Sequence, residues 1–129
     1  MSCFWDALIQ ELRAKRAMTN PMNPKVLAEL LKKNNVQTLN VRWQDEKLSS
    51  KQLQENFHHV KIYDSDSVNS GYWCSTFDPF LFLTCELFKV HISHIYLTTR
   101  IEYKYISHES CPVIPTLQFR SSSSHFSIA

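Results

Sequence analysis

The feature that most constrains the fold is a change in hydrophobic spacing about two-thirds of the way along the chain. Before it, apolar residues recur at helical spacing, and after it they alternate with polar residues, as strands do. Such separation of helices from strands is typical of α+β domains rather than of alternating βα units. We therefore expect an α+β fold in which helices pack against a small, mainly antiparallel sheet. A chain of 129 residues fits a single domain, residues 1–129.

Four segments have the apolar periodicity and capping residues of helices. They are Phe4 to Met18, a helix that begins at the Asn23-Pro24 pair, one capped by Ser49 or Ser50, and one capped by Ser75 or Thr76 with Asp78 and Pro79 in its first turn. In the first helix we expect Glu11 on the solvent side, and we expect Pro21 to end the helix.

Alternating segments predict strands, most of them late in the chain. They are a short strand from Thr38 to Trp43, a hairpin of Val90 to Leu97 with Arg100 to Ile106, and Thr116 to Arg120. After the polar run Ser121 to Ser124, Phe126 and Ile128 should point one way and His125 and Ser127 the other, because side chains alternate along a strand.

Composition excludes several classes of function. The net charge is only +2 and the basic residues are dispersed, so nucleic acid is not an expected partner. No apolar run is long enough to span a membrane, and no leader-like segment is recognised at the N-terminus. Four widely spaced cysteines in such a chain indicate reduced thiols and a cytoplasmic or other reducing compartment. The single glycine, Gly71, excludes glycine-rich phosphate loops and marks a backbone demand.

The sequence does not predict a metal or a cofactor. His91 and His94 could join Cys85 or Cys74 in a zinc site, but three residues along a strand put side chains on opposite faces. The cysteines also lack the short spacing of structural zinc sites. The tryptophans Trp5, Trp43 and Trp73 could line a substrate groove, but such residues more often pack in the core, and we assign them no role from the sequence.

Cys3 and His125 are the candidate catalytic residues. Cys3 lies at the start of the first predicted helix, where the dipole and the free N–H groups favour a thiolate. The distant His125, followed by Phe126, could take the proton, and the pair would support nucleophilic acyl chemistry. The alternative from spacing alone is a buried cysteine and a histidine at the end of a strand.

Three blocks of the sequence resemble the ovarian-tumour (OTU) family of cysteine proteases, which have a papain-like architecture. The blocks are Cys3-Phe4-Trp5-Asp6-Ala7-Leu8, the segment from Gly71-Tyr72-Trp73 through Asp78 to Ile92, and His125-Phe126 after a polar loop. They resemble the family's nucleophile helix, its tryptophan-containing turn with the following buried helix, and its catalytic histidine. They follow one another in the family's order, and the compact chain is similar to what a small viral member could look like.

The resemblance implies that Cys3 is the nucleophile and His125 the general base of a deubiquitinase, with ubiquitin or ubiquitin-like conjugates as partners and backbone N–H groups around Cys3 stabilising the oxyanion. Family members usually carry Asp-Gly shortly before the cysteine, where this chain has Met1 and Ser2. They usually place an acid or amide two positions after the histidine, where this chain has Ser127. A catalytically inactive OTU-like interaction module is the alternative function.

Overall fold

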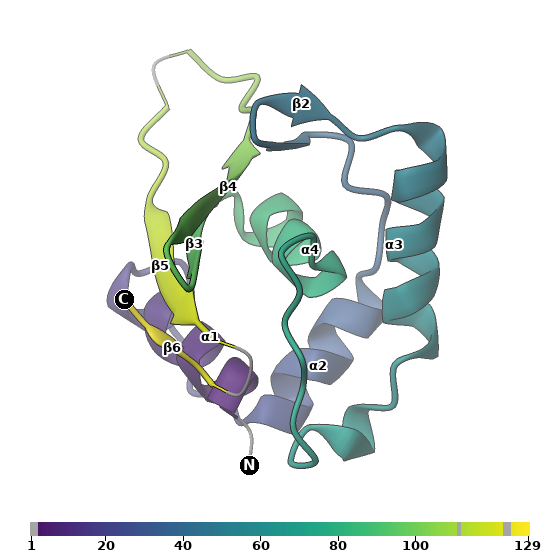
Figure 1. Ribbon diagram of the computed structural model, residues 1–129, viewed down its shortest axis with the longest axis vertical. Coiled ribbons are helices and arrows are strands. Elements are labelled where there is room, and N and C mark those ends of the chain that lie inside the picture. Colours follow the sequence, from purple (N-terminus) through teal and green to yellow (C-terminus); the bar gives the residue numbers. More distant parts are fainter. Residues whose placement is uncertain (1–2, 111, 123–124) are drawn as a thin grey trace.

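The computed structural model describes residues 3–110, 112–122 and 125–129 (Figure 1). Its helices are α1 (Cys3–Ala14), α2 (Pro24–Lys33), α3 (Ser50–Ile62) and α4 (Pro79–Phe88), with a 3-10 turn η1 (Ser65–Ser67). Its strands are β1 (Val41–Trp43), β2 (Glu46–Lys47), β3 (His91–Tyr96), β4 (Thr99–Tyr105), β5 (Thr116–Ser121) and β6 (Phe126–Ile128). The expected α+β class is confirmed.

The described strands form one sheet in the order β2-β1-β4-β3-β5-β6. Strand β3 runs parallel to β5, and the remaining neighbouring strands pair antiparallel, including the expected β3–β4 hairpin. The sheet is therefore mixed and mainly antiparallel. Because β3 and β5 are parallel, their carboxyl ends lie at the same edge, where Tyr96 is opposite Ser121.

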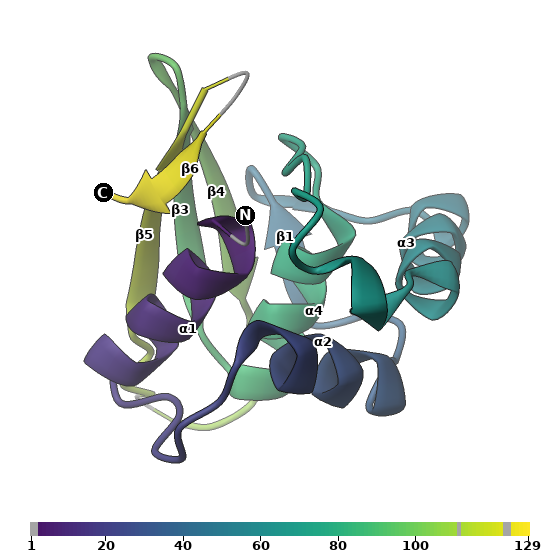
Figure 2. The same ribbon diagram turned by 90° about the horizontal axis from the view of Figure 1, so that it is seen from below.

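The helices are stacked in two layers on one side of the sheet (Figure 2). Helix α1 packs against β5 and β6, and α4 packs against β1, β3 and β4. Helices α2 and α3 form the outer layer, because they contact α1 and α4 and not the strands. One apolar core joins these layers, and it includes the first turn of α1 and the inward face of β5.

Local capping signals fix the starts of three helices. Asn23 caps α2 as expected, and Ser49 forms a capping box with Gln52 at the start of α3. The cap of α4 differs from the expectation. Asp78, rather than Ser75 or Thr76, accepts hydrogen bonds from the first-turn backbone, and Pro79 takes the first helical position.

Helix α1 ends at Ala14, well before Pro21, which corrects the expected boundary. Arg16 adopts a left-handed backbone conformation with φ of 59°, and the carbonyl of Leu12 accepts the N–H groups of Ala17 and Met18. This hydrogen-bonded ending turns the chain back so that Met18 is buried in the core.

Glu11 is buried, contrary to the expectation that it faces solvent. One of its carboxylate oxygens accepts a hydrogen bond from the backbone N–H of Gln118 at 2.9 Å. Glu11 therefore joins α1 to β5. Strand β1 is shorter than the expected strand from Thr38 to Trp43, and Leu39, which precedes it, is 71% exposed.

Candidate functional site

A cavity of about 360 Å³ brings together the two ends of the described chain. Cys3 is the first residue of α1, and His125 immediately precedes β6. Both candidate catalytic residues line this cavity, and the segment before α4 supplies another wall. The lining residues are Cys3, Phe4, Ser70, Gly71, Tyr72, Trp73, Cys74, Ser121, Ser122, His125 and Phe126.

An aromatic cluster beneath the cavity holds the start of α1. Phe4 and Trp5 are buried, with 1% and 0% of their surfaces exposed. The Phe4 ring lies 4.6 Å from Tyr72 and 5.0 Å from Phe126, measured between centroids. These contacts anchor the residue next to Cys3 to both other walls of the cavity, so the half-buried Cys3 lies at their junction.

His125 is held through its backbone and through its neighbour. The backbone N–H of Ser122 donates to the carbonyl of His125 at 2.9 Å. Phe126 is buried and stacks on Phe119, with ring centroids 5.0 Å apart. The imidazole of His125 remains exposed. Ser127, where the family usually has an acid or amide, is opposite Arg120 in the sheet and does not line the cavity.

The wall before α4 depends on Gly71, which has φ of +89°. A Cβ atom here would have no neighbour within 4 Å, so the backbone conformation, rather than space, favours glycine. This confirms the expected backbone demand. The turn presents Trp73, which is 77% exposed and does not have the packing role that is more common for tryptophan. Trp5, in contrast, is a core residue.

Asp78 organises the base of this wall. It is fully buried and accepts hydrogen bonds from the hydroxyl of Tyr72 at 2.8 Å and from the backbone of Ser75 at 3.1 Å, besides capping α4. The Tyr103 hydroxyl accepts from the backbone N–H of Asp78. Burial raises the pKa of Asp78 to about 6, although these hydrogen bonds favour its ionised form. Because this pKa lies above that of an unfolded chain, ionisation of Asp78 lowers stability as the pH rises from about 4 to about 6.

The cavity contains a second thiol in a different environment. Cys74 is half-buried, and burial, followed by the negative charge of Asp78, raises its pKa well above the ordinary range. Cys85 lies in the core, where burial also raises its pKa. Cys3, Cys74 and Cys85 are free thiols, and Cys111 lies outside the described residues. Cys74 is therefore an internal comparison for Cys3.

A buried pair, His94 and Ser121, supports the cavity wall to which Ser121 contributes, and the sequence did not predict it. His94 on β3 has 0% exposure, and its Nε2 lies 2.5 Å from the Oγ of Ser121 on β5. No described residue pairs with its Nδ1. The ring also contacts Phe126, with centroids 5.6 Å apart. Burial lowers the pKa of His94 to about 4, so the imidazole is neutral at pH 7.

Protonation of the unfolded chain at His94 makes a destabilising contribution in acid. Between pH 6.5 and 4 an unfolded chain protonates His94 and the folded chain does not, so the contribution of His94 to the free energy of unfolding should fall by about 2.5 kcal/mol on going to pH 4.5. Asp78 contributes with the opposite sign in the wild type and in the variant alike, so the difference between the two proteins isolates His94. His94→Gln should lack this contribution, as measured by urea unfolding at pH 7 and pH 4.5. His58→Gln, at an exposed position on α3, is the control and should keep the wild-type pH dependence. An equal pH dependence of the wild type and His94→Gln would contradict the prediction.

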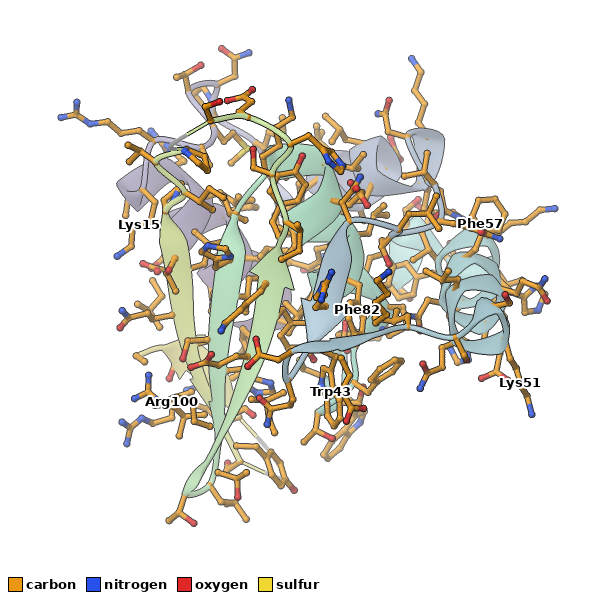
Figure 3. All side chains as sticks on the ribbon, turned by 90° about the horizontal axis from the view of Figure 1, so that it is seen from above. Lys15, Trp43, Lys51, Phe57, Phe82 and Arg100 are labelled. Atoms are coloured by element: carbon orange, nitrogen blue, oxygen red, sulfur yellow. The ribbon has the colours of Figure 1, made fainter. Side chains whose placement is uncertain are left out.

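Other kinds of site receive no support from the described residues. Among them, no three histidine, cysteine or acidic side chains gather as a metal site would require. The Nδ1 atom of His91, a candidate zinc ligand from the sequence, instead accepts a hydrogen bond from the backbone N–H of Tyr105. Lys15, Lys51 and Arg100 lie on separate parts of the molecule (Figure 3). These three basic residues therefore do not form a single basic patch. No helix in the described ranges is both long and apolar enough to cross a bilayer.

No protein-family model, curated protein or solved structure matches the chain. The functional interpretation therefore rests on the geometry of the cavity and on the three sequence blocks that contribute its walls. The roles of Trp73 and Ser121 in lining the cavity, and of His94 in supporting Ser121, were not predicted from the sequence. The sequence signal for this pair is a polar residue in an otherwise apolar inward row, which is His94 on β3 and Ser121 on β5.

Proposed function

We propose that the chain is a cysteine-dependent hydrolase that cleaves ubiquitin or ubiquitin-like conjugates, with Cys3 as nucleophile and His125 as general base. The observation that carries the proposal is that this thiol and this imidazole, at opposite ends of the chain, line one cavity. A cysteine at the start of a helix and a histidine beside the last strand are the parts of an OTU-like, papain-like enzyme. The thiol can act as the nucleophile and the imidazole as the base that activates it.

In the proposed reaction, His125 takes the proton of the Cys3 thiol, and the thiolate attacks the carbonyl carbon of a peptide or isopeptide bond. The tetrahedral intermediate collapses when the C–N bond breaks, and His125 returns the proton to the leaving amine. Water, activated by the same imidazole, then hydrolyses the thioester. No step requires a metal or a cofactor.

The walls of the cavity support an extended polypeptide tail as the substrate. Four of the lining residues are aromatic (Phe4, Tyr72, Trp73 and Phe126), and among them Trp73 is 77% exposed. An aromatic wall can contact the apolar and backbone parts of a tail whose carbonyl reaches Cys3. The C-terminal tail of ubiquitin or a related modifier is our proposed occupant.

A catalytically inactive OTU-like interaction module is the second candidate. The observation that favours it is the composition of the cavity lining, in which the described residues include no carboxylate and no side-chain amide that could orient the His125 ring. Such a module would bind the same modifier through the aromatic wall without covalent chemistry. Thiol reactivity distinguishes the two candidates.

The test is incubation with ubiquitin that carries an electrophile at its C-terminus. We expect the wild type to form a covalent adduct and Cys3→Ala to form none. Cys74→Ala is the matched control, because Cys74 lines the same cavity and its raised pKa keeps it protonated near neutral pH. It should retain the adduct. Mass spectrometry of the adduct identifies the modified thiol.

An adduct on Cys74, or one that persists in Cys3→Ala, would contradict the assignment of the nucleophile. A folded wild type that binds ubiquitin without forming an adduct would favour the interaction module. Absence of both binding and adduct with ubiquitin and its relatives would exclude this substrate class.

A further inference from the structure

The inward faces of β3 and β5 carry buried polar side chains near the cavity, where inward faces of strands are normally apolar. On β5 the inward row is Leu117, Phe119 and Ser121, so a hydroxyl takes the last place of an otherwise apolar row. The neighbouring strand places His94 in the core, although a buried polar group lowers stability unless it is fully hydrogen-bonded. An apolar pair would serve packing better. Departures of this kind concentrate at functional sites.

The hydrogen bonding of His94 indicates that the Ser121 hydroxyl accepts from the imidazole rather than donating to it. The neutral imidazole carries one N–H, and its Nδ1 has no partner among the described residues. An unpaired buried donor is rarer than an unpaired acceptor, so the proton belongs on Nε2 and is donated to Ser121 Oγ over 2.5 Å. The Ser121 hydroxyl, whose oxygen already accepts from His94, keeps its own proton available for donation.

Ser121 lines the same cavity as Cys3 and is only 6% exposed. Its backbone is fixed because its carbonyl accepts the N–H of Leu97 and because the strand is paired on both sides, with Tyr96 and with Phe126. The hydroxyl is thus a preorganised donor at the wall of the cavity. Donors of this kind stabilise the negative oxygen that forms when a thiolate attacks a carbonyl.

We propose that Ser121 donates a hydrogen bond to the oxyanion of the tetrahedral intermediate, and that His94 is the positioning residue that orients its hydroxyl. This inference rests on the proposed function, because it requires Cys3 as the nucleophile. In the step concerned, the sulfur–carbon bond forms and the C=O π pair moves onto oxygen, which accepts from Ser121. Collapse restores the carbonyl and expels the leaving group with its electron pair.

Two reactions of Cys3 separate this role from a structural one. Acylation by p-nitrophenyl acetate passes through a tetrahedral oxyanion and releases p-nitrophenolate. Alkylation by iodoacetamide displaces iodide directly and forms no oxyanion. Both rates are measured on the full chain, and the rates of Cys3→Ala are subtracted to remove the contribution of the other cysteines.

We expect Ser121→Ala to lower acylation of Cys3 by about tenfold or more, because one oxyanion donor is lost, and to leave alkylation within about twofold. Ser121→Thr keeps the hydroxyl and should restore acylation. Ser93→Ala is the matched control, because Ser93 is a buried serine next to His94 but pairs with Arg100 and does not line the cavity. Thermal melting verifies that each variant is folded. His94→Gln should lower the acylation rate by less than Ser121→Ala does.

The proposal is overturned if Ser121→Ala leaves acylation unchanged, or if acylation and alkylation fall by the same factor. A structural role for the hydroxyl would produce the second result. If the wild type acylates no faster than Cys3→Ala, the nucleophile assignment itself fails, and the Ser121 role fails with it. That result is distinguishable because it appears in the wild type before any serine is changed.

Discussion

Replacing His125 by alanine is expected to lower the Cys3-dependent cleavage of a ubiquitin C-terminal fluorogenic substrate about 10³-fold, because the general base that generates the thiolate and protonates the leaving amine is lost. The imidazole is exposed and Phe126, not His125, carries the packing of this segment, so the variant should stay folded. The measurement is kcat/KM at neutral pH, with circular dichroism to verify folding.

His58→Ala is the control for this experiment, because His58 is an exposed histidine on α3 and is not among the residues lining the Cys3 cavity. Its kcat/KM should equal that of the wild type. A His125→Ala variant with wild-type kcat/KM would show that another group serves as the base. In that case the shared cavity would have no catalytic meaning for His125.

Replacing Asp78 by alanine is expected to produce the largest loss of stability. The change removes the cap of α4 and leaves the Tyr72 hydroxyl and the Ser75 N–H without their acceptor. A lost cap and two unpaired polar groups should together lower the free energy of unfolding by about 3 kcal/mol or more. Urea unfolding at pH 7 is the measurement.

Asp66→Ala is the comparison for Asp78, since the Asp66 side chain is exposed and pairs with Lys25 on the surface. Surface pairs contribute little, so this variant should stay near the wild type. If Asp78→Ala proves as stable as Asp66→Ala, the buried network does not hold the cavity wall. If Asp78→Ala folds at low temperature, we also expect weaker reactivity of Cys3, because Tyr72 connects this network to Phe4.

Local signals in the sequence were sufficient for most of the helices and for the hairpin. The caps Asn23 and Ser49 act within their own first turns, so their helices could be predicted from neighbouring residues alone. The end of α1 could not, because the left-handed Arg16 serves to return Met18 to a core that other segments build. Glu11 was misplaced for a similar reason: its partner, the backbone of Gln118, lies on a distant strand.

Some residues of the candidate site could also be predicted from local patterns, whereas others depend on contacts between distant segments. Cys3 and His125 were identified from a helix start and a His-aromatic pair, and both line the cavity. The His94–Ser121 pair depends on the parallel register of β3 and β5, which no local pattern specifies. The exposure of Trp73 depends on the turn around Gly71 and on what the rest of the fold leaves uncovered. Ser127 was considered because OTU proteases usually have an acid or amide at that position, but it is not among the residues lining the cavity.

The central claim is that Cys3 and His125 act as a nucleophile–base pair, and the most direct test is the alkylation of each cysteine by iodoacetamide at pH 5.5, followed by peptide mass spectrometry. In the wild type we expect Cys3 to react faster than Cys74 and Cys85, whose pKa values are raised by burial. In His125→Ala the rate at Cys3 should fall by about tenfold, because the group that takes the thiol proton is missing. Equal rates at Cys3 with and without His125 would contradict the pair.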